Sequence, residues 1–299
     1  RGGHPPLPSS RAPKKEYPGR MATETRFAPS PTGLLHLGHA HSALAGLRRA
    51  GPGGRFLLRI EDIDAGRCRP ELEAAIFEDL GWLGLDWETP VRRQSEHWAD
   101  YRTALDWLDA EGLLYPCFCT RREVAAEIAA IGGAPHGPDG PLYPGTCRRR
   151  SPERRAERIA AGDGYALRLD VEEAMRRTGP LDWIDEIAGP QAATPGILGD
   201  AVLARKDVPA SYHLAVTVDD HLQGITVVTR GLDLFPATHL HRLLQAVMGL
   251  DVPVWRHHAL LTDETGQRLA KRSDALSIRA LREAGHSPEA VRAMAGFGD

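Results

Sequence analysis

The chain has few cysteines and no long apolar run, and each shortage excludes a class of protein. Its 299 residues contain four cysteines, which are too few and too clustered for the disulfide framework of a small secreted domain. No apolar run approaches the roughly 18 residues that a membrane-spanning helix needs. The first twenty residues lack the apolar segment of a secretory signal. We therefore expect a cytoplasmic protein.

The same first twenty residues differ from the rest of the chain in composition and charge. They are rich in Pro, Gly, Ser and basic side chains and carry a net charge of +4. Because the formal net charge of the whole chain is −3, the remainder carries −7. An acidic body argues against indiscriminate nucleic-acid binding but is compatible with a local basic patch. We interpret residues 1–21 as a disordered leader or a start-site artefact, with Met21 as the expected start.

Apolar segments that read as strands alternate with amphipathic helical segments in much of the chain. Residues 55–60 (RFLLRI) predict a buried strand, and 71–83 and 98–111 predict helices with apolar residues on one face. Hydrophobic and charged contents of 42% and 26% are ordinary for a globular protein. This alternation predicts an α/β fold with a doubly wound parallel sheet.

Residues 26–39 (RFAPSPTGLLHLGH) predict a phosphate-binding loop. A short extended stretch and a Pro/Gly turn lead into a helical segment at 40–50, and the free N–H groups and dipole of a helix N-terminus favour anions. Gly38, between His36 and His39, lets the backbone approach a nucleotide closely because it has no side chain. On its own, this H-x-G-H pattern is equally compatible with chance in a chain that has thirteen histidines.

A second basic segment, residues 266–272 (GQRLAKR), follows an apolar run at 259–262. It places three cations within five residues on a loop marked by a glycine. Taken alone, such a run is typical of a solvated basic turn.

Charged side chains also follow two predicted strands. Glu61 and Asp64 come after the strand at 55–60, and Arg230 ends a β-branched strand at 225–230. The carboxyl ends of parallel strands form the ligand-binding edge of an α/β sheet, although the two carboxylates are also compatible with a simple charged strand end. We expect Arg26 and Arg230 to face one crevice, where two guanidinium groups would suit a ligand with two carboxylates.

Residues 116–199 are rich in Gly, Pro and Arg and predict an insertion between two halves of the sheet. Within it, Cys117-Phe-Cys119 and Cys147 supply three of the four donors that a structural zinc site needs. His136 is a chemically ordinary choice for the fourth donor, whereas Tyr143 is an unusual one. Three free buried thiols are the alternative to a metal site.

A cluster of five arginines follows the last of these cysteines. It is compatible both with contact to RNA phosphates and with a solvated helix face paired to nearby glutamates. The five residues are Arg148, Arg149, Arg150, Arg154 and Arg155.

Taken together, four segments resemble the glutamyl branch of the class I aminoacyl-tRNA synthetases. They occur in the family's order, and the resemblance covers roughly residues 23–280. The segments are RFAPSPTG at 26–33, RIEDID at 59–64, residues 212–231 and RLAKR at 268–272. The last departs from the family's usual loop at Arg268, where Lys is more common, and at Ala270, where Ser is more common. The resemblance implies a Rossmann-like sheet.

The resemblance also implies a role for particular residues. L-Glutamate would be bound by Arg26, Ala28, Ser30, Glu61, Tyr212 and Arg230. ATP, accompanied by Mg²⁺, would be bound by His36, Gly38, His39 and Lys271, with His36, His39 and Lys271 acting in catalysis.

Only residues 273–299 follow the basic segment, too few for the anticodon-binding domain of a full-length glutamyl-tRNA synthetase. In this the chain resembles the glutamyl-Q tRNA(Asp) synthetases, which attach activated glutamate to the queuosine base of tRNA(Asp). That resemblance implies one structural zinc ion held by Cys117, Cys119, Cys147 and Tyr143, with Tyr143 favoured over His136. We expect a monomer.

The sequence predicts five units along the chain. They are the leader (1–21), the first half of the catalytic domain (22–115), the insertion (116–199), the second half (200–260), and a catalytic loop with a short helical segment (261–299). Three alternatives remain: a truncated glutamyl-tRNA synthetase, a non-catalytic paralogue that binds RNA or glutamate, and a nucleotidyltransferase that shares the H-x-G-H loop. The last gives no reason for the paired arginines and Tyr212.

Overall fold

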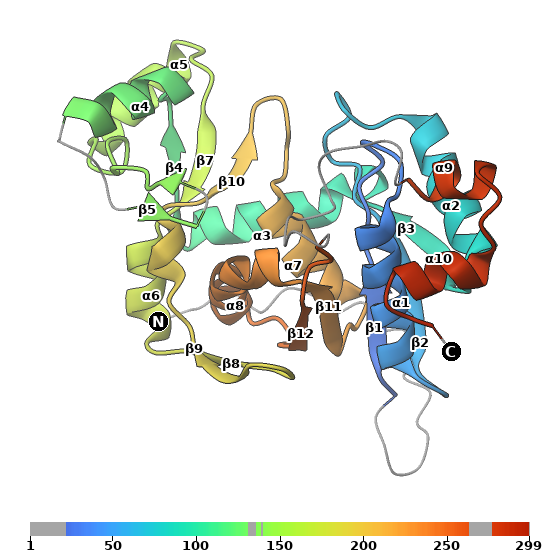
Figure 1. Cartoon of the computed structure of the whole chain (residues 1–299). Helices are drawn as coiled ribbons and strands as arrows, with labels where there is room; N and C mark the ends of the chain where they lie inside the picture. Colours follow the sequence, from blue (N-terminus) through green and yellow to red (C-terminus); the bar gives the residue numbers. More distant parts are fainter. Residues whose placement is uncertain (1–21, 131–135, 139, 263–276, 299) are drawn as a thin grey trace.

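The computed structural model describes residues 22–130, 136–138, 140–262 and 277–298 (Figure 1). Its first part alternates strand and helix, as the sequence predicts. The elements are β1 (Glu24–Phe27), α1 (Leu37–Ala50), β2 (Arg55–Ile60), α2 (Pro70–Trp82), β3 (Glu88–Arg93), a 3-10 turn (Gln94–Glu96) and α3 (Trp98–Ala110). The helices predicted at 71–83 and 98–111 are therefore α2 and α3.

The middle of the chain contains short elements. These are β4 (Leu114–Cys117), α4 (Arg121–Ala130), β5 (His136–Gly137), β6 (Gly140–Pro141), α5 (Pro152–Ala160), β7 (Ala166–Leu169), α6 (Val171–Thr178), β8 (Asp182–Asp185), β9 (Gly189–Ala192), a 3-10 turn (Pro195–Leu198) and β10 (Val202–Arg205). Longer elements then return. They are α7 (Tyr212–Leu222), β11 (Val227–Gly231), a 3-10 turn (Leu232–Leu234), α8 (Phe235–Met248), β12 (Val254–His258), α9 (Ile278–Glu283) and α10 (Pro288–Met294).

Two sets of parallel strands meet at the centre of the molecule. Strands β1, β2 and β3 are parallel neighbours, and so are β11, β12 and β8, with β9 antiparallel at the outer edge. The backbone N–H of Thr226 donates to the carbonyl oxygen of Glu24 at 3.0 Å, which places the start of β11 beside β1. The predicted doubly wound α/β fold is confirmed.

The insertion predicted at 116–199 and the central sheet interleave along the chain. Strands β8 and β9 lie within that range but join the central strands. Strand β10 lies beyond it but pairs antiparallel with β7, which in turn pairs with β4. The division into five units stays a prediction. Strand pairings cross its predicted boundary between residues 199 and 200.

Helix α7 resolves an ambiguity that periodicity leaves open. Residues 214–218 are consistent with either a strand or a buried helix, and they form part of a helix that begins after the N-cap Ser211. All five are buried because α7 contacts α3 on one side and α8 on another. A helix buried all round lacks the polar face that marks most helices in a sequence.

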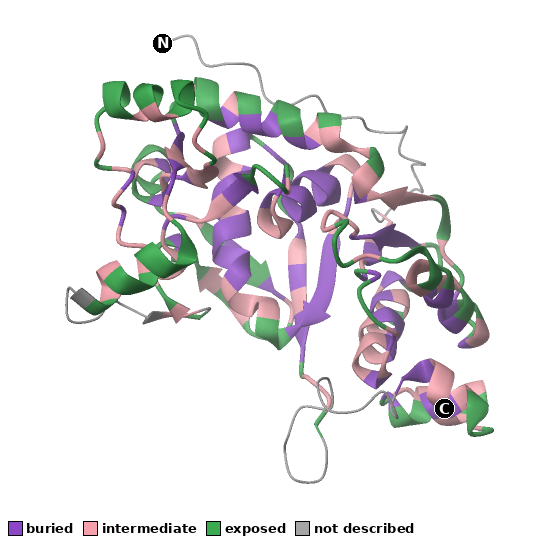
Figure 2. Ribbon diagram, turned by 90° about the horizontal axis from the view of Figure 1, so that it is seen from above, coloured by how far each residue is buried: buried purple, intermediate pink, exposed green. Residues whose placement is uncertain are grey.

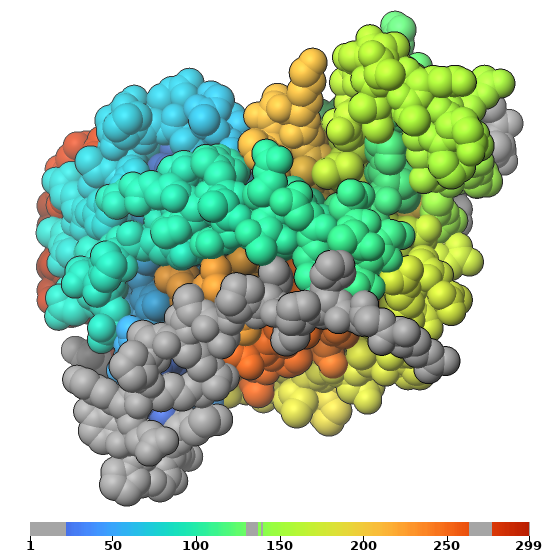
Figure 3. Space-filling view, turned by 180° about the vertical axis from the view of Figure 1, so that it is seen from behind, coloured from blue at the N-terminus to red at the C-terminus, as the bar shows by residue number. Residues whose placement is uncertain are grey.

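Buried side chains concentrate in the central strands and on the inward faces of the helices, whereas the helices near the cysteines are mostly exposed (Figure 2). Seen from behind, the residues of α3 (teal) extend across the molecule from the part of the chain before them (cyan) toward the middle segment (yellow-green) (Figure 3). Within the described part of the chain, none of the helices has the length and apolar character that crossing a membrane requires.

Candidate active site

A cavity of about 480 Å³ opens at the carboxyl ends of β1 and β11. It is lined by all nine of the described residues that the sequence predicts for binding glutamate and ATP. They are Arg26, Ala28, Ser30, His36, Gly38, His39, Glu61, Tyr212 and Arg230. Lys271, the tenth, lies outside the described residues, as does the whole segment 266–272.

Arg26 belongs to a buried network of charges on one side of the cavity. Its guanidinium pairs with Asp220 through Nε–Oδ1 at 3.0 Å and Nη2–Oδ2 at 3.3 Å. Arg59, which is fully buried, donates to Asp220 at 2.8 Å and to Glu61 at 3.2 Å. Burial alone would raise the pKa of Asp220, but Arg26 and Arg59 hold that pKa below its ordinary value. Asp220 is therefore ionised and keeps Arg26 in place.

Arg230 lies on the other side and has a different environment. Its Nε donates to His257 Nε2 at 3.1 Å, its Nη2 donates to Thr238 Oγ1 at 2.7 Å, and its Nη1 lies 3.2 Å from His241 Nδ1 and 3.4 Å from Tyr212 Oη. Within the described part of the chain it forms no ion pair, although it is only 5% exposed. Burial lowers the pKa of Arg230. A buried cation without an anionic partner favours binding of a carboxylate.

The two histidines of the H-x-G-H loop form the N-terminus of α1. His36 is the N-cap: its Nδ1 accepts from the Gly38 N–H at 3.1 Å, and its own N–H donates to His39 Nδ1 at 3.2 Å. The helix begins at Leu37, three residues before the predicted 40–50 segment, because these side chains satisfy the first N–H groups. A Cβ on Gly38 would lie 3.0 Å from His36 Cε1, so glycine gives this ring its space.

The described residues on either side of the basic segment lie at the cavity. Leu260 and Leu261 line it before the segment begins. After the segment, Ser277 forms a β-bridge with His36, and the Ile278 N–H donates to the Leu35 carbonyl oxygen at 2.8 Å. The described chain therefore lies at the cavity at Leu261 and beside the H-x-G-H loop at Ser277.

Sequence reasoning missed several cavity-lining residues. Asp233, Ser42 and His258 line the cavity, and His258 Nε2 lies 3.0 Å from Ser42 Oγ. Asp233 follows β11 as Glu61 follows β2, so a carboxylate after a strand was an available signal. Ser42 lies one helical turn after Gly38, and this spacing was a weaker sequence signal.

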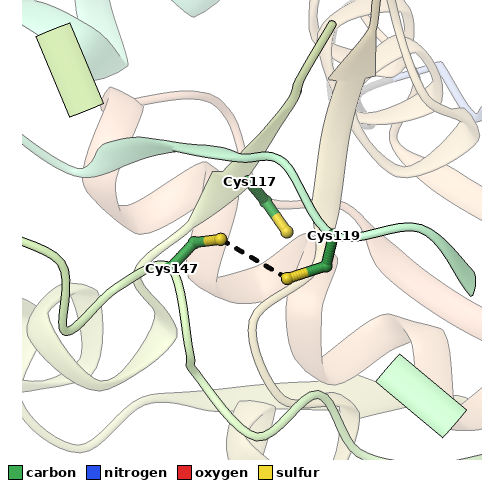
Figure 4. A group of neighbouring side chains, drawn as sticks. All are labelled: Cys117, Cys119 and Cys147. Carbon is green, nitrogen blue, oxygen red and sulfur yellow. Dashed lines mark hydrogen bonds between the residues drawn. The ribbon is translucent and has the colours of Figure 1, made fainter. Parts of the chain in front are cut away.

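The three cysteines of the middle segment form a cluster (Figure 4). Their sulfur atoms lie within 4.8 Å of one another, and Cys119 Sγ is 3.4 Å from Cys147 Sγ. Tyr143 Oη lies 3.4 Å from Cys117 Sγ and 3.6 Å from Cys119 Sγ. The structure thus brings together the four donors that the resemblance implies. The side chain of His136 lies outside what the structure describes.

The chemistry of this donor set fits a divalent cation. Burial acts to raise the pKa of the Cys147 thiol, but hydrogen bonds from the Phe118 backbone and from Tyr143 hold that pKa below its ordinary value. Burial raises the pKa of the Cys119 thiol to about 12, so this thiol is disposed to keep its proton when no cation is bound. A bound zinc ion reverses this preference, because the thiolate is its ligand. The cluster could therefore hold a metal through Cys117, Cys119 and Cys147.

The arginine cluster divides into inward and outward members. Arg148 forms ion pairs with Asp170 at 3.3 Å, Glu172 at 3.2 Å and Asp200 at 3.6 Å, and Arg155 lies over the Tyr115 ring. These two are held by the fold. Arg149 and Arg154 are exposed, and for them contact with RNA remains a prediction.

Comparison with known proteins agrees with this geometry. Residues 22–297 match the family of tRNA synthetases class I (E and Q), catalytic domain. The glutamyl-Q tRNA(Asp) synthetase of Rhodobacter capsulatus is 47% identical over 279 residues, covering 91% of this chain and 99% of that protein. That of Symbiobacterium thermophilum is also 47% identical, covering 89% and 83%. The chain belongs to the class I tRNA synthetases of the E and Q type, among the glutamyl-Q tRNA(Asp) synthetases.

Several longer relatives match this chain over part of their own length. The glutamate–tRNA ligase of Aquifex aeolicus is 41% identical over 90% of this chain, which covers 55% of that protein. Crystal structures of glutamate–tRNA ligases from Elizabethkingia meningosepticum and Elizabethkingia anophelis superpose with TM-scores of 0.75 and 0.77 at 29% and 30% identity. Each superposition covers 92% of this chain, which corresponds to 60% of the first ligase chain and 61% of the second. The predicted class I fold is confirmed.

Proposed function

We propose that this chain is an ATP-dependent ligase that activates L-glutamate as glutamyl-adenylate and transfers it to the queuosine base of tRNA(Asp). The observation that carries the proposal is the single cavity that is lined by all nine of the described residues predicted for glutamate and ATP. The relatives named glutamyl-Q tRNA(Asp) synthetase support the choice of amino acid and tRNA.

Glutamate fits the arginine side of this cavity. Arg26 and Arg230 are both nearly fully buried there, and two guanidinium groups suit the two carboxylates of glutamate. Ala28, Ser30, Glu61 and Tyr212 complete the proposed binding site. Since Arg230 lacks an ion-pair partner in the described part of the chain, we assign it the carboxylate that is not activated.

ATP fits the other side, where α1 begins. We assign its phosphates to the N-terminus of α1, with His36, Gly38 and His39 at the nucleotide. Lys271 is proposed to stabilise the pyrophosphate leaving group, and Mg²⁺ bridges the phosphates as part of the nucleotide substrate.

The reaction has two steps. An oxygen of the glutamate α-carboxylate attacks the α-phosphorus of ATP, the bond to the β-phosphate oxygen breaks, and pyrophosphate leaves. A hydroxyl of queuosine then attacks the carbonyl carbon of the mixed anhydride, loses its proton and releases AMP. The protein contributes positioning and charge stabilisation rather than a covalent nucleophile.

We propose one structural zinc ion on Cys117, Cys119, Cys147 and Tyr143. Such an ion would join the end of β4 to the loop after β6, and it takes no part in the reaction. The proposal also includes a monomeric, cytoplasmic enzyme and the five units predicted along the chain.

The test is incorporation of radiolabelled glutamate into purified tRNA. We expect labelling of tRNA(Asp) that contains queuosine and none of tRNA(Asp) from a strain that lacks the modified base. Labelling of tRNA(Glu) instead would identify a truncated glutamyl-tRNA synthetase. No labelling of either tRNA would overturn the proposed transfer.

A further inference from the structure

The position of Arg230 depends on groups that lie behind the cavity. Four of the five N–H groups of its guanidinium have a partner, and each partner is uncharged: the histidines 257 and 241, a threonine and a tyrosine. Nε, which bonds to His257, is the guanidinium nitrogen that is attached to the side-chain stem, whereas Nη1 and Nη2 are the terminal nitrogens. The orientation of the terminal nitrogens therefore depends on whether His257 can accept the Nε–H bond.

His257 can accept it only in one protonation state, which Asp185 selects. Asp185 Oδ2 lies 2.7 Å from His257 Nδ1 and 3.0 Å from its backbone N–H, while Oδ1 accepts from the N–H groups of Ile187 at 2.9 Å and Ala188 at 2.8 Å. Because a carboxylate can only accept, the proton of the neutral imidazole must lie on Nδ1. Nε2 is then an acceptor, 3.1 Å from Arg230 Nε and 3.2 Å from Thr238 Oγ1, which itself accepts from Arg230 Nη2.

The register of strands β8, β12 and β11 brings Asp185, His257 and Arg230 into contact. Arg230 on β11 is the direct partner of His257 on β12, and Trp255, two residues earlier on β12, is the partner of Asp185 on β8. The three residues therefore lie at neighbouring positions of β11, β12 and β8, which are adjacent and parallel (Figure 1). Asp185 and His257 are each 3% exposed or less.

We propose that Asp185 and His257 are positioning residues that fix Arg230 in the orientation in which it receives a carboxylate of the substrate. This inference rests on the proposed function, because it takes the carboxylate to be that of glutamate. Neither residue lines the cavity, so both act through Arg230.

A neutral imidazole suits this task better than a carboxylate would. A carboxylate on Arg230 would compensate its charge, as Asp220 compensates that of Arg26. The imidazole accepts the bond and leaves the charge uncompensated. His257 also stays neutral: burial, and next Arg230, lower its pKa to about 4 despite the bond to Asp185. His241, whose Nε2 lies 3.1 Å from His213 Nδ1, is a second uncharged support on the opposite side.

Substitution of Asp185 by Asn tests the tautomer. Where the amide NH₂ of the Asp185→Asn variant faces His257, the imidazole must turn Nδ1 into an acceptor and place its proton on Nε2, opposite the Nε–H of Arg230. We expect the KM for glutamate in ATP–pyrophosphate exchange to rise about 10- to 100-fold. The KM for ATP should stay within about twofold, since the nucleotide residues are untouched. An unchanged KM for glutamate in a folded Asp185→Asn protein overturns the proposal.

Two substitutions of His257 separate the hydrogen bond from packing. His257→Gln offers an amide oxygen to Arg230 and an NH₂ to Asp185, so we expect the KM for glutamate to rise less than about threefold. His257→Leu fills the space but accepts nothing, and we expect a rise of at least about tenfold. Equal effects of Gln and Leu would contradict the positioning role.

His239→Gln is the matched control. His239 is a buried histidine of the same region, and its Nδ1 accepts from Trp183 Nε1 at 3.3 Å and from the Thr194 N–H at 3.1 Å, with no contact to Arg230. We expect this variant to keep the wild-type KM for glutamate, whatever its melting temperature. A rise equal to that of His257→Leu would show that any buried histidine here produces the effect.

A spectroscopic readout does not depend on activity. In ¹⁵N NMR of the imidazole side chains, with the His257→Gln spectrum used for assignment, we expect His257 as the Nδ1–H tautomer between pH 6 and 8 in the wild-type protein. An Nε2–H tautomer or a doubly protonated ring would overturn the inference. If the wild-type protein shows no exchange activity, the proposed function fails, and this spectrum alone decides whether Asp185 and His257 hold Arg230 as described.

Discussion

Arg26 and Arg230 reach one cavity from neighbouring strands, but of the two only Arg26 has an anionic partner among the described residues. Arg26 forms a two-bond pair with Asp220, whereas Arg230 contacts only uncharged acceptors among the described residues. The two side chains lie 204 positions apart in the sequence. Their different environments predict different consequences when either charge is removed.

Replacing each arginine by Gln separates stability from activity. Arg26→Gln leaves Asp220 buried with Arg59 as its remaining cation, and we expect the free energy of unfolding to fall by about 2 kcal/mol. Arg230→Gln removes a buried cation that has no anionic partner in the described part of the chain, so stability should change by less than about 1 kcal/mol. We expect kcat/KM for glutamate to fall at least about 100-fold. Urea denaturation and ATP–pyrophosphate exchange measure the two quantities. A larger stability loss for Arg230→Gln would contradict this account of its environment.

The cysteine cluster predicts zinc content. We expect about one zinc ion per chain by atomic emission, and a Cys147→Ser variant that has lost both the ion and several degrees of melting temperature. Cys68→Ser is the control, because Cys68 lies outside the cluster and should keep the wild-type zinc content. Equal zinc in the two variants would exclude the proposed ligand set.

Asp79 predicts a pH-dependent loss of stability. This residue of α2 is fully buried, and neither carboxyl oxygen has a hydrogen-bond partner among the residues that the structure describes. Burial raises its pKa from 3.8 to about 6. The folded state therefore holds this proton more tightly than the unfolded state, and its stabilising effect is lost as the pH rises from about 4 through 6. Asp79→Asn should raise the free energy of unfolding by about 2 kcal/mol at pH 8 and by almost nothing at pH 4.

The control for this substitution is Glu78→Gln on the same helix. Glu78 is 54% exposed and pairs with Arg282, so we expect less than about 1 kcal/mol at either pH. Denaturation curves at pH 4 and pH 8 give both numbers. A gain for Asp79→Asn that is the same at the two pH values would show that ionisation of Asp79 is not its source.

Gly38 predicts a specific defect in nucleotide binding. In Gly38→Ala the new methyl group would lie 3.0 Å from His36 Cε1, so we expect the His36 ring to move and the KM for ATP to rise about tenfold. Gly81→Ala in α2, where a Cβ meets nothing within 4 Å, should gain about 0.5–1 kcal/mol and keep its activity. Wild-type KM for ATP in Gly38→Ala would remove the proposed role of this loop.

Much of the fold and site could be predicted because those features are local. The hydrophobic pattern predicts the strand at 55–60 and the helices at 71–83 and 98–111. Motif residues at strand ends meet in one cavity because the carboxyl ends of parallel strands lie at the same edge of the sheet. Pairing across the sheet could not be predicted. The contacts of Asp185 with His257 depend on the register of β8 and β12, which no local pattern specifies. The sequence did not predict that β8 joins the central strands or that β10 pairs with β7, and the reason is the same.

The most direct test of the central claim is glutamate-dependent ATP–pyrophosphate exchange by the purified protein without tRNA. The described residues predicted for glutamate and ATP line one cavity, and Arg230 is held by His257 from within the fold. We therefore expect exchange that requires glutamate and ATP and proceeds with no tRNA present. Exchange that begins only after tRNA is added would indicate a truncated glutamyl-tRNA synthetase. The absence of exchange under both conditions would contradict glutamate activation and leave a binding protein with a synthetase fold.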